Sequence, residues 1–440
     1  MRPCKVIISG GGVTGLTLAL MLEKVGVDYV LLEAHSDILC SNAGTGICML
    51  PNGLRILDQL GCYEALLARA GYAIDSVTVR GPEGEILSHT DGWEKWALQR
   101  YGYKAFWCDR GTLLEAIYNQ IGDKSKILPE KTVEIVEHME NGVKVKTQDG
   151  FVYQGDFIVG ADGVHSRVRQ EMARHACEIG VGEQLSKEND VPSSYCCLFG
   201  ISKSVQGVSG GTLEYVMNKG FSYIVGSGPE NRTYWALMKN LGKTYHGEDI
   251  PRFGFKDEKR IIEEHWNDRI GPEISFSDLY NNPLRPTVLR PMREFTYSKW
   301  FLHRMLIIGD AAHQMTIIVA QGGNQAIESA AALTNSLVSA LSGKQTTERL
   351  SCHEIETLFE KVQQTRFARV KDIVERSHQR QRMDSMETPK MEYYMLHEFP
   401  SLLPGVIKDR WDQTFESAVS LHTLEVPLRQ KTFRWLDESE

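Results

Sequence analysis

Three motifs that contain glycine or an acid follow apolar segments of this chain, and each could bind part of a dinucleotide. The first is GGGVTG at 10–15, between an apolar run over 5–9 and an apolar helix predicted over 16–24. Gly10 permits a tight turn, Gly12 lets the backbone approach a pyrophosphate, and Gly15 lets the helix pack closely on the strand. The motif therefore predicts a phosphate site at a helix N-terminus.

An acid follows the next predicted strand at a spacing that suits a ribose. The apolar run 29–32 ends in Glu33, about twenty residues after Gly12. A carboxylate there can accept hydrogen bonds from the two hydroxyls of an adenosine ribose. Strand, glycine turn, helix and acid together predict a Rossmann-type site, without distinguishing FAD from NAD.

The other two motifs place an Asp at the end of an apolar run. Asp162 ends the first run and precedes a predicted helix with Arg167 and Arg169, which could neutralise phosphate or lie on the surface. Asp310 ends the second run and precedes a glycine pair at 322–323 and a helix rich in small residues. Carboxylates at strand ends can bind sugar-like hydroxyls, and amides at a helix start can face an anionic or electron-rich ring.

In this order and spacing, the motifs resemble those of the single-component FAD-dependent monooxygenases of the aromatic-hydroxylase type. The likeness is strongest to fungal members that epoxidise prenyl chains in meroterpenoid and indole-diterpene pathways. The family pattern D-G-x-x-S-x-V-R is met over 162–169, the G-D pattern at 309–310, and D-R-x-x-L-L over 109–114. The resemblance covers about residues 5–345.

The resemblance implies an oxidoreductase that uses NADPH and O2 to epoxidise or hydroxylate a prenylated secondary metabolite. NADPH is expected to bind transiently as a co-substrate, because no second G-x-G-x-x-G is present. No side chain can be assigned as catalytic, but Tyr215 and Tyr223 are candidates for the wall of an apolar substrate pocket. FAD is expected to bind non-covalently through these residues: Gly10, Gly12, Gly15, Glu33, Gly46, Arg110, Asp162, Asp310, Gly322 and Gly323.

The loop after Asp310 departs from the family pattern at two positions. Family members have a proline where this chain has Ile317, and a glycine where it has Ala320. A proline fixes φ and a glycine lets backbone approach a ring, so both changes are expected to crowd or reshape the loop beside the flavin. They support an alternative function, a non-redox cyclase or isomerase on the same flavoprotein scaffold.

The predicted fold is α/β, with a Rossmann-like FAD-binding domain, an inserted antiparallel β-sheet substrate domain and C-terminal helices. Alternating segments between about 193 and 241 predict the antiparallel strands. The FAD-binding domain is predicted over 1–75, 105–185 and 299–345. The substrate domain is predicted over 76–104 and 186–298, and a helical appendage over 346–440.

Composition excludes several classes of protein. The net charge of −8 and the dispersed basic residues argue against nucleic-acid binding. The nine cysteines form no zinc-binding spacing, and no apolar run reaches the ~18 residues of a membrane span. We therefore expect a cytoplasmic protein with reduced thiols and no transmembrane segment, which touches a membrane only peripherally if at all.

Overall fold

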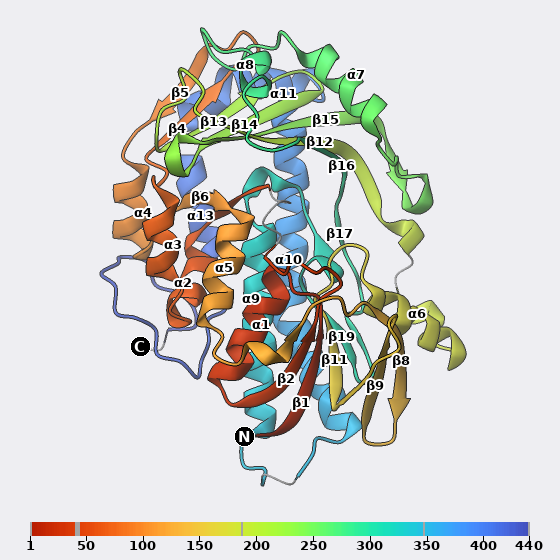
Figure 1. The fold of residues 1–440 in the computed structure, drawn as a ribbon. Coiled ribbons are helices and arrows are strands. Elements are labelled where there is room, and N and C mark those ends of the chain that lie inside the picture. Colours follow the sequence, from red (N-terminus) through yellow and green to blue (C-terminus); the bar gives the residue numbers. More distant parts are fainter. Residues whose placement is uncertain (1, 40–44, 186–187, 346–347, 439–440) are drawn as a thin grey trace.

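The computed structural model describes residues 2–39, 45–185, 188–345 and 348–438. Its lower layer in Figure 1 contains a six-stranded sheet in the order β18-β19-β11-β1-β2-β7. All neighbouring strands are parallel except β18 and β19. Their bounds are β1 Arg2–Ser9, β2 Val27–Leu32, β7 Ile127–Leu128, β11 Phe157–Gly160, β18 Phe301–Leu302 and β19 Met305–Ile307. Residues 6–8, 30–32, 157–159 and 305–307 of the central strands are buried and apolar because both faces of the sheet are covered there.

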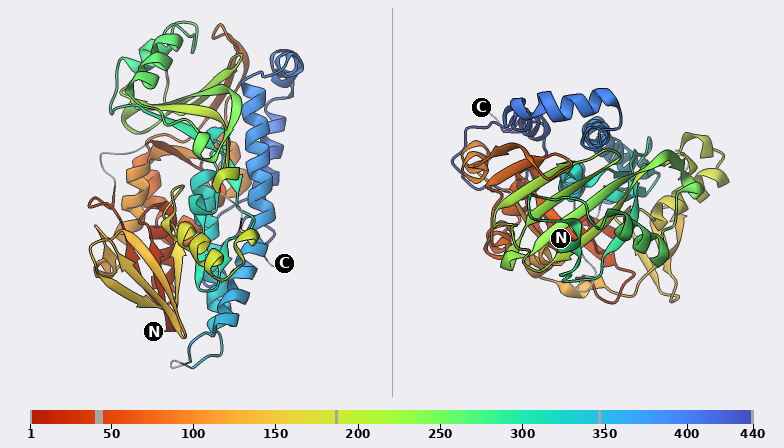
Figure 2. Two further views of the ribbon diagram at one scale, coloured as in Figure 1. Left: turned by 90° about the vertical axis from the view of Figure 1, so that its right-hand side faces the viewer. Right: turned by 90° about the horizontal axis from the view of Figure 1, so that it is seen from above.

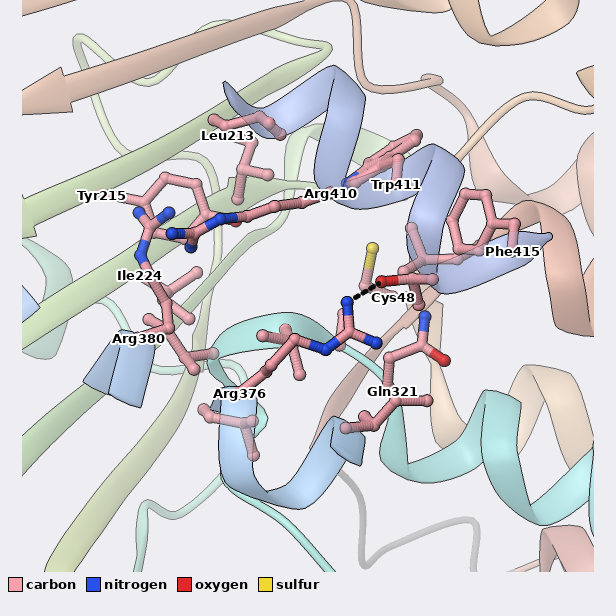
Figure 3. A pocket seen from close by; sticks show the side chains of 18 of the residues that line it. Cys48, Leu213, Tyr215, Ile224, Gln321, Arg376, Arg380, Arg410, Trp411 and Phe415 are labelled. Atoms are coloured by element: carbon pink, nitrogen blue, oxygen red, sulfur yellow. Dashed lines mark hydrogen bonds between the residues drawn. The ribbon is translucent and has the colours of Figure 1, made fainter. Parts of the chain in front are cut away.

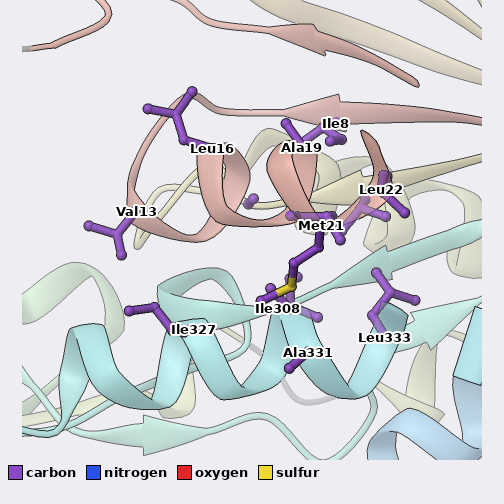
Figure 4. Close-up of a cluster of buried hydrophobic side chains, with 14 of the residues drawn as sticks. Ile8, Val13, Leu16, Ala19, Met21, Leu22, Ile308, Ile327, Ala331 and Leu333 are labelled. Carbon is purple, nitrogen blue, oxygen red and sulfur yellow. The ribbon is translucent and has the colours of Figure 1, made fainter. Parts of the chain in front are cut away.

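Helix α1 (Val13–Lys24) packs on β2 and against α5 (Arg110–Gln120) and α9 (Gly322–Leu341). Figure 4 shows Met21 of α1 pointing toward α9, where Ala331 leaves room for it. Thr334 Oγ1 donates to Met21 Sδ at 3.5 Å. Small residues on α9 therefore let the two helices approach closely beneath the sheet.

A smaller sheet and a helix flank the other side of the six strands. The small sheet has the order β10-β9-β8, with β8 Val133–Met139, β9 Gly142–Thr147 and β10 Val152–Gly155. The helix is α6 (Arg167–Glu178), whose N-cap Ser166 accepts a hydrogen bond from Arg169 N at 3.0 Å. This capped start places α6 directly after the Asp162 turn.

The upper layer in Figure 1 is a seven-stranded sheet in the order β16-β12-β15-β14-β13-β4-β5. Only the β13–β4 pair is parallel. Its strands are β4 Ser76–Arg80, β5 Ile86–Thr90, β12 Pro192–Ser202, β13 Thr212–Met217, β14 Phe221–Ser227, β15 Thr233–His246 and β16 Val288–Arg293. One face packs on α7 (Phe255–His265) and α8 (Phe276–Tyr280), and the other turns toward the lower layer. The predicted α/β class with an antiparallel second sheet and C-terminal helices is confirmed, while the domain boundaries stay a prediction.

Helix α10 (Cys352–Asp384) runs beside both layers, as Figure 2 shows. Its 33 residues correspond to about 50 Å of helix. After it come α11 Pro389–Tyr393, a π-helical turn Tyr394–Glu398, α12 Phe399–Leu402 and α13 Gly405–Phe415. None of the described helices is long and apolar enough to cross a membrane.

The remaining elements connect the layers. Strands β3 (Gly46–Met49) and β6 (Phe106–Asp109) pair, as do β17 (Phe295–Thr296) and β20 (His313–Gln314). The helices are α2 Pro51–Gln59, α3 Tyr63–Ala70 and α4 Trp93–Tyr101.

Candidate cofactor and substrate site

The glycine turn between β1 and α1 leaves no room for side chains. Gly10 has φ +100°, and a Cβ on it would lie 2.5 Å from the Ala161 carbonyl oxygen. A Cβ on Gly15 would lie 1.9 Å from the Gly10 carbonyl oxygen. Gly12 is the N-cap of α1, and a Cβ on it would meet the Arg110 guanidinium at 3.3 Å. The turn thus exposes helix N–H groups next to a positive charge, as a pyrophosphate requires.

Strand order brings the three predicted motifs together. Strand β1 lies next to β11, and β11 next to β19, so their carboxyl ends meet at one edge. Ser9 Oγ donates to Asp162 Oδ2 at 3.2 Å, which joins the first motif to the second. Gly309 has φ +62°, and a Cβ on it would lie 2.4 Å from Thr14 Oγ1, so the third motif touches α1.

One carboxylate oxygen of Asp162 caps a helix, and the other is free to bind a ligand. Its Oδ2 accepts from Arg167 N at 2.8 Å and Val168 N at 3.2 Å, which caps α6. Its Oδ1 is buried and has no hydrogen-bond partner among the described residues. Burial also raises the pKa of this carboxyl. A hydroxyl or amide of a bound cofactor would satisfy that oxygen.

Two further acids stand at this edge. Glu33 Oε2 accepts from Gly11 N at 2.5 Å and its Oε1 accepts from His35 N at 2.8 Å, so the carboxylate faces the glycine turn. Burial raises the pKa of Asp310 to about 6, although the positive charge of Arg110 opposes that shift. The glycine cradle, the arginine and the three acids fit a dinucleotide such as FAD.

The other predicted glycines have different surroundings. A Cβ on Gly46 would lie 2.4 Å from the Tyr234 ring, and one on Gly323 would lie 2.6 Å from Ile47 Cδ1. These two glycines therefore allow β3, β15 and α9 to pack closely. A Cβ on Gly322 would meet no heavy atom within 4 Å, so backbone at the start of α9 borders open space.

A cavity of about 250 Å³ lies between the second sheet, the loop after Asp310 and the C-terminal helices (Figure 3). Its apolar wall includes Leu213 and Ile224 from the sheet and Trp411 and Phe415 from α13. The loop residues 317–321 close another side. That loop begins seven residues after Asp310, so a short stretch of chain joins the cavity wall to the edge where the three motifs meet.

The two tyrosine candidates lie on opposite faces of the second sheet. Tyr215 pairs with Ile224 across strands β13 and β14, and both line the cavity. Tyr223 pairs with Val216 and packs toward α7 and α8, where its hydroxyl donates to Asp268 Oδ2 at 2.7 Å. Only Tyr215 is therefore placed to meet a substrate in this cavity.

The two departures from the family pattern both lie in the cavity wall. Residues Ile317–Val319 form a 3-10 turn, closed by Ala320 N donating to the Ile317 carbonyl at 2.8 Å. Ala320 has φ +52° and ψ +33°, the left-handed region that favours glycine. Its carbonyl accepts from Asn324 Nδ2 at 2.7 Å, which ties the turn to α9. The loop thus adopts a glycine-like backbone although it carries an alanine.

Residues 3–367 match the FAD binding domain family. FAD-dependent monooxygenase dpchE of Colletotrichum higginsianum is 36% identical over 379 residues, which cover 85% of this chain and 79% of that protein. FAD-dependent monooxygenase olcE of Penicillium canescens is 34% identical over 426 residues, 97% of this chain and 90% of that protein. This chain belongs to the FAD-dependent monooxygenases.

Solved structures share the fold of this monooxygenase. Klebsiella pneumoniae HpxO in complex with FAD and uric acid has a TM-score of 0.74 at 19% identity, over 94% of this chain and 97% of that one. CtdE in complex with FAD and a substrate has a TM-score of 0.67 at 19% identity, over 93% and 99%. The predicted family, enzyme class and flavin cofactor are thereby confirmed.

A buried charge network supports the cavity loop of the monooxygenase, and the sequence motifs do not reveal it. Glu328 on α9 accepts from Arg366 Nη1 at 2.5 Å, from Arg369 Nε and Nη2 at 2.8 Å, and from Asn52 Nδ2 at 2.7 Å. Asn52 Nδ2 also donates to Gln321 Oε1 at 3.0 Å. The carboxylate therefore links α2, α9 and α10 to the last residue of the loop.

The sequence also missed the contribution of the C-terminal segment to the cavity. Helices α10 and α13, predicted only as part of an appendage, supply the following lining residues: Ile373, Arg376, Gln379, Arg380, Met383, Ile407, Arg410, Trp411, Gln413, Thr414 and Phe415. Arg376 and Arg380 stand four residues apart on α10, with polar residues between them. That pattern is also typical of an ordinary surface helix, so it carried no signal by itself.

Proposed function

We propose that this monooxygenase uses NADPH and O2 to epoxidise or hydroxylate an apolar, prenylated substrate in the cavity beside the Ile317–Val319 turn. The observation that carries the proposal is the composition of the cavity wall, which is mainly aliphatic and aromatic. A prenyl chain is apolar and flexible, and it would gain about 25 cal/mol for each Å² removed from water.

The wall favours epoxidation of an alkene over hydroxylation of a phenol. Among the described lining residues none is Asp, Glu or His. Burial raises the pKa of the Cys48 thiol and of the Tyr215 hydroxyl to about 12, so both stay protonated at neutral pH. Phenol hydroxylation benefits from a base that raises the electron density of the ring, whereas an alkene needs only placement and exclusion of water.

Bound FAD would supply the reductive activation of O2. In this proposal Gly10, Gly12 and the Arg110 guanidinium bind the pyrophosphate, and Glu33 binds the adenosine ribose. Asp162, after β11, and Asp310, after β19, accept hydrogen bonds from hydroxyl or amide groups of the cofactor. Gly46, Gly15 and Gly323 act by allowing close packing around the cofactor, and Gly322 leaves space for it.

The single G-x-G-x-x-G and the family resemblance support NADPH as a transient co-substrate. The non-redox cyclase or isomerase rests on Ile317 and Ala320 alone. Ala320 still adopts the backbone conformation of the family's glycine. The alanine therefore gives little reason to prefer the non-redox reaction. Membership of the FAD-dependent monooxygenases favours the redox reaction.

The test is oxygen incorporation by purified holoenzyme with NADPH, heavy-isotope O2 and a farnesylated phenol. Mass spectrometry should find one heavy oxygen atom in the product, and the substrate should accelerate NADPH oxidation. Product that forms without NADPH or without O2 would favour the non-redox alternative.

A cavity variant with a matched control links turnover to the cavity. Leu213→Phe narrows the cavity and should lower the fraction of NADPH oxidation that yields product, with the flavin spectrum retained. Leu98→Phe makes the same change on α4, where the side chain is 38% exposed and lies outside the cavity, and should leave coupling unchanged. Equal coupling in both variants would place the reaction elsewhere.

A further inference from the structure

Three arginines line the otherwise apolar cavity. Arg376 and Arg380 come from α10 and Arg410 comes from α13. In Figure 3, Arg380 and Arg410 reach toward Tyr215, while Arg376 extends toward Gln321. No acidic side chain is among the described residues that line the cavity. Asp384 and Asp372 pair with Arg380 and Arg376 from outside the wall, so among the described residues one of the three positive charges has no counter-ion.

Arg380 forms an ion pair with Asp384 and keeps one buried donor unsatisfied. Arg380 is 8% exposed, and its Nε donates to Asp384 Oδ1 at 2.7 Å. The guanidinium stacks over the rings of Tyr215 and Phe399 at 5.0 and 5.1 Å from their centroids. Its Nη2 is buried and has no hydrogen-bond partner among the residues that the structure describes. An unpaired buried donor destabilises the protein, the more so on a charged group, unless a ligand accepts a hydrogen bond from it.

The other two arginines keep donors free as well. Arg376 Nη2 forms an ion pair with Asp372. Its Nη1 donates weakly to Thr414 Oγ1 at 3.4 Å, the dashed contact in Figure 3, and its Nε is buried without a described partner. Within the described part of the chain, Arg410 has no hydrogen bond or ion pair. Burial, together with the positive charge of nearby Arg380, lowers the pKa of Arg410. The Arg380 and Arg410 guanidinium groups repel each other, and the negative charge of Asp384 offsets only part of that repulsion.

We propose that the substrate carries an anionic oxygen group, a carboxylate or an ionised enol or phenol, which binds Arg376, Arg380 and Arg410. The inference rests on the proposed function and adds the chemistry of the head group to it. Planar guanidinium groups bind carboxylates and similar oxygens through paired, charge-assisted hydrogen bonds. The apolar chain then extends from the arginines along Leu213 and Ile224 toward the Ile317–Val319 turn. The arginines would thus hold the head group in one position and thereby determine which carbon of the apolar chain lies next to the flavin.

The experiment compares two probes that differ by one charge and carry no free phenol, farnesylated para-methoxybenzoic acid and its methyl ester. Binding to oxidised holoenzyme is followed through the flavin absorbance spectrum, which requires no turnover. The acid should bind about tenfold more tightly than the ester, and the preference should shrink at high salt. Arg410→Gln should abolish most of the preference, and Arg410→Lys, which keeps the charge, should restore part of it.

The matched control is Lys371→Gln on α10, which removes one positive charge from a side chain that is 58% exposed and lies outside the cavity. It should keep the full preference for the acid. Equal affinity for acid and ester, failure of the acid to bind, or a preference unchanged in Arg410→Gln would each overturn the proposal. Oxygen incorporation is measured separately on both probes. Turnover of the ester without any acid preference would therefore refute this inference alone, and acid preference without incorporation would refute the proposed reaction alone.

Discussion

Replacing Glu328 by glutamine should destabilise the monooxygenase strongly, because it leaves two buried arginines without their counter-ion. The side chains of Glu328 and Arg366 are 0% exposed and that of Arg369 is 7% exposed. Burial lowers the pKa of Arg366 to about 10, so its guanidinium stays charged at neutral pH. The amide of glutamine would keep some hydrogen bonds and would carry no charge.

Two estimates of the loss agree. Burial alone would raise the pKa of Glu328, but Arg369 and Arg366 outweigh it and lower the pKa from 4.5 to about 2. At about 1.4 kcal/mol per unit, this shift corresponds to roughly 3 kcal/mol of stability at neutral pH. Breaking a buried ion pair by removing one partner typically costs about 3–5 kcal/mol. Because burying the arginines offsets part of the gain, we expect a loss of about 3 kcal/mol.

The pH dependence gives the sign of the effect. A carboxyl whose pKa is lower in the folded state contributes its stability above pH 4.5 and loses it as the pH falls toward about 2. The difference between wild type and Glu328→Gln should therefore be full at pH 7 and shrink in acid. Urea unfolding followed by tryptophan fluorescence is a suitable assay, since Trp300 packs beside α10. The backbone N of Trp300 donates to Gln363 Oε1 on that helix at 2.9 Å.

The control is Glu375→Gln, also on α10, where the carboxylate is 66% exposed and lies 3.9 Å from Lys371. That exposed pair should contribute no more than about 0.5 kcal/mol. A loss below about 1 kcal/mol in Glu328→Gln, or one that persists undiminished in acid, would refute the charge argument.

Three further predictions concern the cofactor edge and the loop. Glu33→Ala should weaken FAD binding about ten- to a hundredfold by removing charge-assisted hydrogen bonds, measured by flavin fluorescence after dialysis; full retention of FAD would contradict its role at the ribose. Asp310→Asn should make the apoprotein more stable above pH 6 and leave it unchanged below about pH 4, because a carboxyl with a raised pKa destabilises the fold only when ionised. Thermal melts across this pH range test the sign, and a stability loss at pH 7 would contradict it. Ala320→Gly should stabilise the protein by about 1 kcal/mol, because glycine adopts φ +52° without strain; denaturant midpoints that fall would show that the alanine methyl matters more in the cavity wall.

The cofactor edge could be predicted from the sequence because its determinants are local. The glycine spacing at 10–15 specifies a turn, and the apolar run before it specifies a buried parallel strand. The same reasoning placed Asp162 and Asp310 each at the end of a strand, and the structure adds that these strands are neighbours. Family resemblance then supplied the identity of the cofactor, which the motifs alone left open.

The substrate cavity could not be predicted in the same way, because it depends on strand faces and distant contacts. Tyr215 and Tyr223 are both buried strand tyrosines, and only the pairing of Tyr215 with Ile224 reveals which face meets the cavity. Asn52 and Glu328 meet although 276 positions separate them in the chain. No periodicity or motif encodes such a contact, since it arises only when α2 and α9 pack together.

The match to the FAD binding domain family ends at residue 367, part-way along α10, while Arg376, Arg380 and the α13 residues of the cavity lie beyond that point. The part of the chain that defines the family therefore holds the flavin, and a single contiguous segment after it forms one wall of the substrate cavity. This division would allow the C-terminal segment to vary and change the substrate, while the segment that binds FAD stays the same. A graft of the segment after Arg369 from a relative, which keeps both ion pairs of Glu328, should alter which molecules are accepted and leave the cofactor edge unchanged.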